Sequence, residues 1–266
     1  MKAFLQSPGF DSFKRISVIC LTIVALMTVG IGFYNVLHSP LFTVRVVEVS
    51  DLPENSPVDA QAITDLAAVP VDVTNLFDLD LHRIETRMLT HPWVREVLIS
   101  KRFPQTVSIT VVFRDPKALI QKPNGDLSYV DSNGMIFSKV NLMSQPDLPV
   151  LTGISKNHEV AKTQVLKALQ FLAAWDKSKL ERVSQISSLS YDTERGFRAL
   201  VTYPLGRGRG QGRTMVHLGQ EIDADFENMA DRLRHVFAYL IDNGISAKQV
   251  WADLGKKVVV KIARSS

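Results

Sequence analysis

The feature that most constrains this chain is an unbroken run of uncharged, mainly apolar residues from Ile16 to Leu37. As a helix rising ~1.5 Å per residue, this run is long enough to cross a hydrocarbon core ~30 Å thick. A cleavable signal peptide has a shorter apolar stretch, about 7–15 residues, followed by small residues at the cleavage site. Residues 34–40 do not have that pattern. The sequence therefore predicts a retained single-pass transmembrane helix at 16–37.

The charges around this run predict its orientation. Lys14 and Arg15 directly precede it, whereas the segment that follows it is mainly acidic. The positive-inside rule then places residues 1–15 in the cytoplasm and everything after the run on the far side of the membrane. The whole chain carries a net charge of only +4, and its basic residues are scattered. A duplex-binding face needs clustered Lys and Arg, so we expect no nucleic-acid partner.

Cysteine use agrees with this topology. The single cysteine, Cys20, lies inside the apolar run. We therefore expect no disulfide in the exported region and no cysteine nucleophile there.

Residues 42–114 have the pattern of a small α+β domain. The β-branched segment 43–49 predicts a strand. Ser56 followed by Pro57 predicts the N-cap and first turn of a helix that ends near Ala68. Leu81, Ile84 and Met88 share one face of a second predicted helix, which we expect Pro92 to end. Two strands follow, at 94–102 and 106–111, around a turn at 103–105, and Trp93 is expected to be a core anchor. The predicted order is β-α-α-β-β.

Residues 115–266 predict a larger, strand-rich domain with two long helices. The first helix, at 159–175, places Val165, Leu166, Leu169, Leu172 and Ala173 on one stripe. The second places Ile222, Phe226, Met229, Leu233, Val236 and Leu240 at helical spacing. The predicted strands are a hairpin at 127–138, single strands at 186–191, 197–203 and 214–219, and a closing hairpin at 250–262. The complete fold class is α+β: one transmembrane helix, a β-α-α-β-β domain, and a mixed β domain with two long helices packed on an antiparallel-rich sheet.

Several short motifs occur in a specific order directly after the predicted span. They are Asn75-Leu76-Phe77-Asp78-Leu79-Asp80, His91-Pro92-Trp93-Val94, Lys101-Arg102-Phe103-Pro104, the alternating Val107, Ile109 and Val111, and Arg114 with Pro116 and Ala118. This region resembles the POTRA domain of the FtsQ/DivIB cell-division proteins. The rest resembles the β domain of that family through Leu148-Pro149, Leu151, Gly153, Val216-His217-Leu218-Gly219 and Asp253-Leu254. Gly255 departs from the Arg that usually follows the Asp-Leu pair, and almost nothing follows the last predicted strand.

The resemblance implies both a domain order and a role. The order is a cytoplasmic tail at 1–15, a transmembrane helix at 16–37, a POTRA domain at 42–114 and an FtsQ-type β domain at 115–266. The implied role is a scaffold of the bacterial divisome, in the inner membrane at the division septum, with its large domains in the periplasm or its equivalent. The implied partners are single-pass division proteins of the FtsB/FtsL type, with further divisome membrane proteins reached through the POTRA domain. An anchored POTRA component of an export or envelope-assembly system is the alternative.

A search for catalytic motifs finds none that is complete. The segment His158-Glu159-Val160-Ala161-Lys162 has Lys162 where a zincin has its second zinc-binding histidine. Neither a G-x-S-x-G elbow nor an S-x-x-K motif occurs. We therefore expect a non-enzymatic protein without cofactor or metal. The Gly/Arg-rich run at 206–213 predicts a basic hairpin tip, with contact between Arg207, Arg209 or Arg213 and anionic lipid headgroups or glycan as the functional reading.

The last strand is the candidate binding site. A closing strand with little after it is expected at a sheet edge, where unpaired N–H and C=O groups can accept a partner strand. Val258, Val260 and Ile262 are expected on one face, and Val259 and Lys261 on the other. The competing interpretation is a core strand already paired on both sides. The predicted partner-binding residues are Arg195, Asp253, Leu254, Lys256, Lys257, Val258, Val259, Val260, Lys261 and Ile262.

Overall fold

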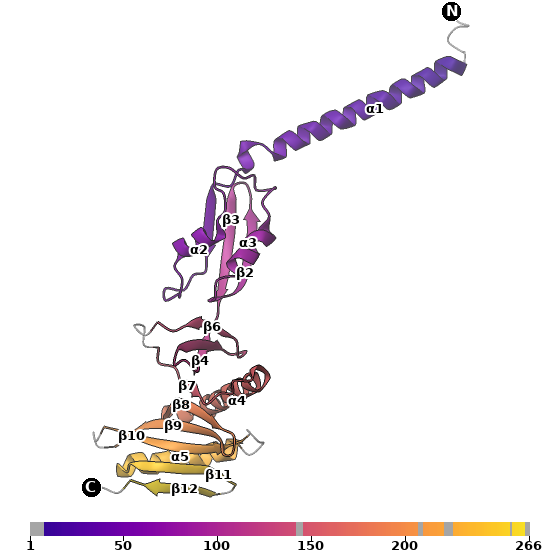
Figure 1. Cartoon of the computed structure of the whole chain (residues 1–266). Helices are drawn as coiled ribbons and strands as arrows, with labels where there is room; N and C mark the ends of the chain where they lie inside the picture. The colour runs from indigo at the N-terminus through magenta and orange to yellow at the C-terminus, as the bar shows by residue number, and fades with distance from the viewer. Residues whose placement is uncertain (1–7, 142–145, 207–209, 221–225, 256, 264–266) are drawn as a thin grey trace, which may run out of the picture. The chain divides into compact units, whose positions relative to one another are not determined.

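The computed structural model describes residues 8–141, 146–206, 210–220, 226–255 and 257–263. It separates into two compact units, Met1–Phe113 and Arg114–Ser266, each with a hydrophobic core of its own (Figure 1). The sequence predictions for Arg207, Arg209, Ile222 and Lys256 concern residues outside the described ranges.

The first unit begins with helix α1, Pro8–Leu37. Its segment Arg15–Leu37 is the one helix in the described residues that is long and apolar enough to cross a membrane. The hydroxyl groups of Thr22 and Thr28 donate to the carbonyls of Ile19 and Val24, both at 2.8 Å. Because these polar groups are satisfied within the helix, its surface suits an apolar solvent. The helix therefore fits a single-pass membrane anchor.

After the short 3-10 helix η2, Pro40–Phe42, the first unit forms a three-stranded sheet in the order β1-β3-β2. Strand β1 runs parallel to β3, and β2 runs antiparallel to it. The bounds are β1 Val46–Ser50, α2 Ala60–Ala67, α3 Leu81–Met88, β2 Val94–Arg102 and β3 Thr106–Phe113. Ile63 and Ala67 of α2, and Ile84 and Met88 of α3, are buried in one core with Val107 and Ile109 of β3. The predicted β-α-α-β-β order is confirmed.

Two helix boundaries in this unit differ from the sequence prediction. Asp59, not Ser56, caps α2, and its carboxylate accepts a hydrogen bond from the Ala62 N–H at 2.7 Å. Ser56 is not the cap because its hydroxyl donates to the Val58 carbonyl at 2.6 Å and closes a turn before the helix. Helix α3 ends at Met88, ahead of Pro92, because the chain turns at Leu89 and Thr90. The proline therefore lies beyond the helix end and does not cause it.

Two further positions were also predicted differently. Strand β1 begins at Val46 because Val44 is hydrogen-bonded elsewhere: its N–H donates to the Thr74 carbonyl at 3.0 Å. Trp93 is only half-buried, and the adjacent Val94, 1% exposed, fills the core instead. A strand that starts at residue 94 points alternate side chains inward. Its first inward position is therefore taken by the valine.

The second unit contains a nine-stranded mixed sheet in the order β12-β11-β10-β9-β8-β7-β4-β5-β6. Its strands are β4 Pro116–Gln121, β5 Leu127–Asp131, β6 Ile136–Lys139, β7 Val150–Thr152, β8 Gln185–Asp192, β9 Gly196–Pro204, β10 Gln211–Gly219, β11 Ala247–Leu254 and β12 Lys257–Ile262. The helices are α4 His158–Lys177, the 3-10 helix η4 Leu180–Arg182, and α5 Phe226–Asn243. Five neighbouring pairs are antiparallel and three are parallel, which confirms the predicted antiparallel-rich sheet.

The two long helices share a core with the sheet. Phe171 of α4 packs on Phe197 of β9, with ring centroids 4.9 Å apart, and Phe237 of α5 packs on Tyr203 of the same strand at 5.3 Å. The hydroxyl of Tyr203 donates to the Ile245 carbonyl at 3.1 Å and accepts from the Ala247 N–H at 2.8 Å. The start of β11 is thereby fixed against β9.

The predicted stripe on α4 is only partly correct. Val165, Leu169 and Leu172 are buried, but Leu166 is half-buried and Ala173 is exposed. The deepest positions belong to a neighbouring face, which carries Ala168, Phe171 and Trp175. Arg213 also differs from its prediction, because it lies within strand β10 and not in a hairpin tip.

Candidate partner-binding edge of the second sheet

Strand β12 lies at one edge of the nine-stranded sheet and pairs with β11. The register joins Val260 to Val250, Val259 to Trp251 and Lys261 to Gln249. No described strand pairs with the other side of β12. The backbone groups that point away from β11 can therefore receive a further strand.

The side chains of β12 alternate as an edge strand should. Val258 and Val260 pack against the core that lies under α5. Lys257, Val259 and Lys261 face solvent, and Val259 is 45% exposed. Ile262 departs from the predicted alternation, because it is 56% exposed. The pairing shifts register between Gln249 and Ala247, opposite this end of β12, and Ile262 does not continue the inward row.

The turn that leads into β12 is held from helix α5. Gly255 has φ +67°, a left-handed conformation that glycine adopts at little cost. The guanidinium of Arg232 on α5 donates to the Gly255 carbonyl at 2.8 Å. The left-handed backbone therefore explains why residue 255 is a glycine. The guanidinium that reaches this turn comes from helix α5.

A row of side chains crosses the sheet face that is turned away from the helix-bearing core, and it ends at β12. Arg198 of β9 is opposite His217 of β10, His217 is opposite Trp251 of β11, and Trp251 is opposite Val259. The rings of His217 and Trp251 stack with centroids 5.4 Å apart and planes 6° from parallel. We call Arg198, His217 and Trp251 the open-face row. A partner strand added to β12 would extend this row beyond Val259.

The open-face row holds buried polar atoms without a hydrogen-bond partner among the described residues. His217 is 5% exposed and its Nε2 makes no hydrogen bond there, nor does Nε of Arg198. Burial lowers the pKa of His217, the Asp253 carboxylate opposes this, and the charges of Arg198 and Arg195 add to the lowering. The row therefore offers a buried imidazole of lowered pKa beside one ion-paired arginine, whose Nη2 lies 3.4 Å from the Asp192 carboxylate.

Arg195 lies in the turn between β8 and β9. Its N–H donates to the Asp192 carboxylate at 3.2 Å, and this bond and one from the Glu194 N–H lower the pKa of Asp192. Arg195 and Asp253 both act electrostatically on His217, the middle residue of the open-face row. In sheet order β9 is three strands from β12. The structure thus groups Arg195 with Asp253, and groups Lys257 with Leu254, its register partner.

Sequence reasoning did not single out the open-face row. The available signal was strand alternation: once Phe197, Ala199 and Val201 are assigned inward, Arg198 must point outward. The same argument applies to His217 beside Val216 and to Trp251 beside Val250. What the sequence does not show is that these three strands are neighbours, because their pairing is long-range.

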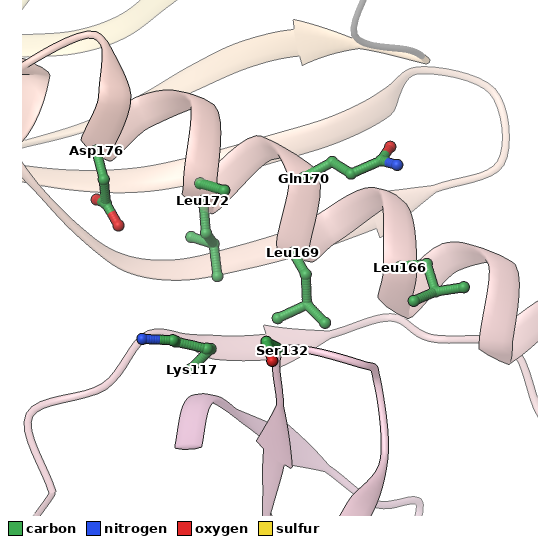
Figure 2. Close-up of a pocket in the computed structure, with 8 residues that line it drawn as sticks. Lys117, Ser132, Leu166, Leu169, Gln170, Leu172 and Asp176 are labelled. Atoms are coloured by element: carbon green, nitrogen blue, oxygen red, sulfur yellow. The ribbon is translucent and has the colours of Figure 1, made fainter. Parts of the chain in front are cut away.

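A second feature of this unit is a pocket of about 510 Å³ beside α4. Figure 2 shows Leu169 and Leu172 of α4 pointing toward Lys117 of β4 and Ser132, which follows β5, and Leu166 also lines the pocket. Asp176 lies at its rim, and burial followed by the charge of Glu181 raises the pKa of this carboxyl. No group of three or more His, Cys, Asp or Glu side chains in the described residues could hold a metal ion.

The architecture defines a class before any comparison is made: a protein with one membrane-suited helix, a POTRA-like unit and a larger mixed-sheet unit. Comparisons with known proteins then identify the family. The model "POTRA domain, FtsQ-type" matches residues 42–113, and "Cell division protein FtsQ/DivIB, C-terminal" matches residues 118–255, which is over half of the chain. The chain belongs to the FtsQ/DivIB family of cell-division proteins.

Individual relatives agree with this assignment. Cell division protein FtsQ of Myxococcus fulvus is 30% identical over 82% of this chain and 72% of its own length. The protein of that name from Geotalea daltonii is 28% identical over 87% of this chain and 80% of its own. That of Syntrophotalea carbinolica is 26% identical over 71% of this chain, and the match spans 64% of its length, slightly under two thirds.

Proposed function

We propose that this protein is a non-enzymatic divisome scaffold that captures a single-pass partner of the FtsB/FtsL type by strand addition at β12. The observation that carries the proposal is the position of β12 at the sheet edge with no described strand on its outer side. Family membership supports the division role. It also disfavours the alternative of an export or envelope-assembly component.

The proposed topology follows the charge bias of the sequence. The tail 1–15 is cytoplasmic, 16–37 spans the inner membrane, and the POTRA domain at 42–114 and β domain at 115–266 are extracytoplasmic. Lys14 and Arg15 precede the span, which favours this orientation. Both folded units are then on the side where the extracytoplasmic part of a single-pass partner is found.

Capture combines backbone pairing with side-chain recognition. The outward N–H and C=O groups of β12 supply hydrogen bonds to the incoming strand. Lys257 and Lys261 are exposed and attract acidic side chains, as does the exposed Arg195 in the turn between β8 and β9. Leu254, 54% exposed at the end of β11, and Ile262, at the end of β12, give the partner two apolar contacts.

Two-colour imaging tests this function. The full-length chain, fused to a fluorescent protein and expressed as the sole copy, is expected at midcell together with its FtsB-type partner. Deletion of residues 257–266 is expected to disperse the partner and leave the chain itself at midcell. A uniform envelope signal of the chain would instead support the export alternative, and a partner that stays at midcell would contradict capture by β12.

A further inference from the structure

Exposed apolar residues gather at one end of the POTRA sheet. Strand β1 starts there and the β2–β3 turn lies there, because Val46 and Arg102 are both register partners of Thr106. The exposed residues of this end are Leu41 at 67%, Val73 at 81%, Phe77 at 38% and Phe103 at 57%. The residues just before β1 and the segment 70–74 are joined there, since the Asp72 N–H donates to the Val44 carbonyl at 2.8 Å.

Three aromatic rings form the centre of this surface. Phe42 packs against Phe77 with centroids 5.1 Å apart, Phe77 against Phe103 at 5.2 Å, and Phe42 against Phe103 at 6.3 Å. The rings come from three separate segments, at 40–42, 77 and 103. Lys101 fixes one of them, because its ammonium group donates to the Phe77 carbonyl at 3.1 Å. The cluster is thus a formed part of the fold, although two of its rings face outward.

This surface lies next to the end of the membrane-suited helix. Asn75 Nδ2 donates to the carbonyl of Leu37, the last residue of α1, at 2.8 Å. His38 is 3.5 Å from the Asp78 carboxylate and stacks on Tyr34 with centroids 4.0 Å apart. Leu41 is four residues beyond Leu37, a span of at most ~14 Å. The helix and the aromatic surface are therefore joined both along the chain and by direct contacts.

Bilayer dimensions place this surface at headgroup depth. The segment Arg15–Leu37 has 23 residues, and a helix of that length spans ~34 Å against a hydrocarbon core of ~30 Å. Leu37 then lies at the hydrocarbon boundary. The headgroup zone extends about 5–7 Å further on each side, and residues a few positions beyond Leu37 occupy it. Trp and Tyr are enriched at this depth, and Phe and Leu are among the side chains that interfacial segments bury at the boundary between headgroups and acyl chains.

We propose that Leu41, Phe77 and Phe103 form a membrane-contacting surface that seats the POTRA domain on the lipid bilayer holding its own anchor. The inference rests on the proposed membrane anchoring. Apolar burial drives the contact, because the nearby charges balance: Arg45, Lys101 and Arg102 are opposed by Glu48, Asp72 and Asp78. The surface is therefore expected to bind neutral and anionic lipid alike. Seating would restrict how the POTRA domain tilts above the membrane.

Depth-dependent quenching tests the proposal in the full-length chain. With Cys20→Ser as background, single cysteines at Phe103→Cys, Leu41→Cys or Leu98→Cys carry an environment-sensitive fluorophore. The chain is reconstituted in phosphatidylcholine vesicles, or in phosphatidylethanolamine–phosphatidylglycerol vesicles, with headgroup-nitroxide lipid. Leu98 is the matched control: it is 70% exposed and apolar, but lies five residues back along β2, ~16 Å away.

The expected result is at least about twofold stronger quenching at positions 103 and 41 than at 98, in both lipid mixtures. Quenching at 103 and 41 no stronger than at 98 would overturn the proposal, and so would quenching that needs anionic lipid. A wild-type chain labelled at Cys20 is read with acyl-chain nitroxide. If Cys20 is not quenched, the membrane anchoring has failed and the inference fails with it. If Cys20 is quenched and position 103 is not, only the seating is wrong.

Discussion

Each edge strand of the nine-stranded sheet, β12 and β6, has an apolar side chain whose exposed fraction is nearly the same as that of one on the other edge. Val259 of β12 is 45% exposed and Ile136 of β6 is 43% exposed. Their backbones differ in length, because β12 has six residues and β6 has four, whereas the pairing of each with its neighbour shifts register. The exposed fraction of Val259 and Ile136 alone would thus not distinguish the two edges.

The neighbours of the two strands differ as well. Phe137 of β6 is occupied within the chain, stacked on Tyr129 at 5.8 Å with the Arg114 guanidinium 6.0 Å above its ring. Asp131 holds the turn before β6 by accepting hydrogen bonds from the Asn133 and Met135 N–H groups, both at 2.9 Å. A short, irregular strand with satisfied neighbours is a protected edge. Strand β12 also shifts register in its pairing with β11, but it is longer, it carries no packed aromatic ring, and the open-face row leads up to it.

Proline substitutions at the two edges should show the largest difference. Successive N–H groups of a strand point to opposite sides, so one of Val259→Pro and Val260→Pro removes an outward donor and the other removes a bond to β11. Both are expected to weaken partner capture by more than about tenfold, since a lost ladder bond and a distorted strand exceed ~1.4 kcal/mol. Pulldown from membranes with the full-length chain measures this. Ser138→Pro in β6 is the matched control, and an equal loss there would remove the distinction between the edges.

Trp251 should give the next largest effect. Trp251→Ala removes the ring that stacks on His217 and flanks Val259, and a central tryptophan of an interface commonly contributes about 1–2 kcal/mol or more. Capture is expected to weaken roughly tenfold, as measured by titration of the partner in detergent. Phe137→Ala should leave capture unchanged, because that ring packs within the chain. A response to Phe137→Ala equal to that of Trp251→Ala would show that the open-face row has no special role.

Charge changes on β12 should have a smaller effect that depends on salt. Lys257→Gln and Lys261→Gln remove exposed cations, so each is expected to slow association a few-fold at low ionic strength and less at high ionic strength. Stopped-flow binding at two salt concentrations measures this. Lys139→Gln in β6, which breaks the 3.1 Å ion pair with Asp126, serves as the control. Equal rates for wild type and both β12 variants would exclude steering by these lysines.

Acidification should act through His217. Burial lowers the pKa of folded His217 below the value of ~6.5 for an unfolded chain. Between these two pKa values the unfolded state binds more protons than the folded state. The contribution of His217 to the free energy of unfolding is therefore fully present above pH ~6.5 and is lost as the pH falls through the folded pKa. Thermal unfolding of wild type is expected to shift to lower temperature on acidification, and to shift less in His217→Gln. Identical pH profiles would show that His217 does not contribute this dependence.

Local patterns predicted most elements of the chain but fewer of its boundaries. Strict alternation at 106–111 correctly predicted β3, and the turn residues 131–134 correctly predicted the β5–β6 hairpin. The cap of α2 was predicted at Ser56, but Asp59, three residues later, caps the helix, and the Ser56 hydroxyl donates to the Val58 carbonyl instead. Helix α4 carries apolar residues on two adjacent faces, one for the core and one for the pocket. Periodicity could not rank these faces.

The candidate site was only partly predictable, because an edge is a property of the whole sheet. The last strand was predicted to be an edge strand, and among the described strands the sheet order places β12 at one edge. Whether a partner strand binds there stays a prediction. The convergence of Arg198, His217 and Trp251 depends on β9, β10 and β11 being neighbours, with β11 parallel to β10 across the intervening α5. Such long-range pairing leaves no local trace in the sequence.

Photocrosslinking in whole cells tests the difference between the edges most directly. A photoreactive residue replaces Val259 in one full-length chain and Ile136 in another, two positions of nearly equal exposure on opposite edges. Strand capture at β12 predicts a crosslink from position 259 to a single-pass partner of the FtsB/FtsL type and none from position 136. Crosslinks of equal yield from both positions, or from position 136 alone, would contradict it.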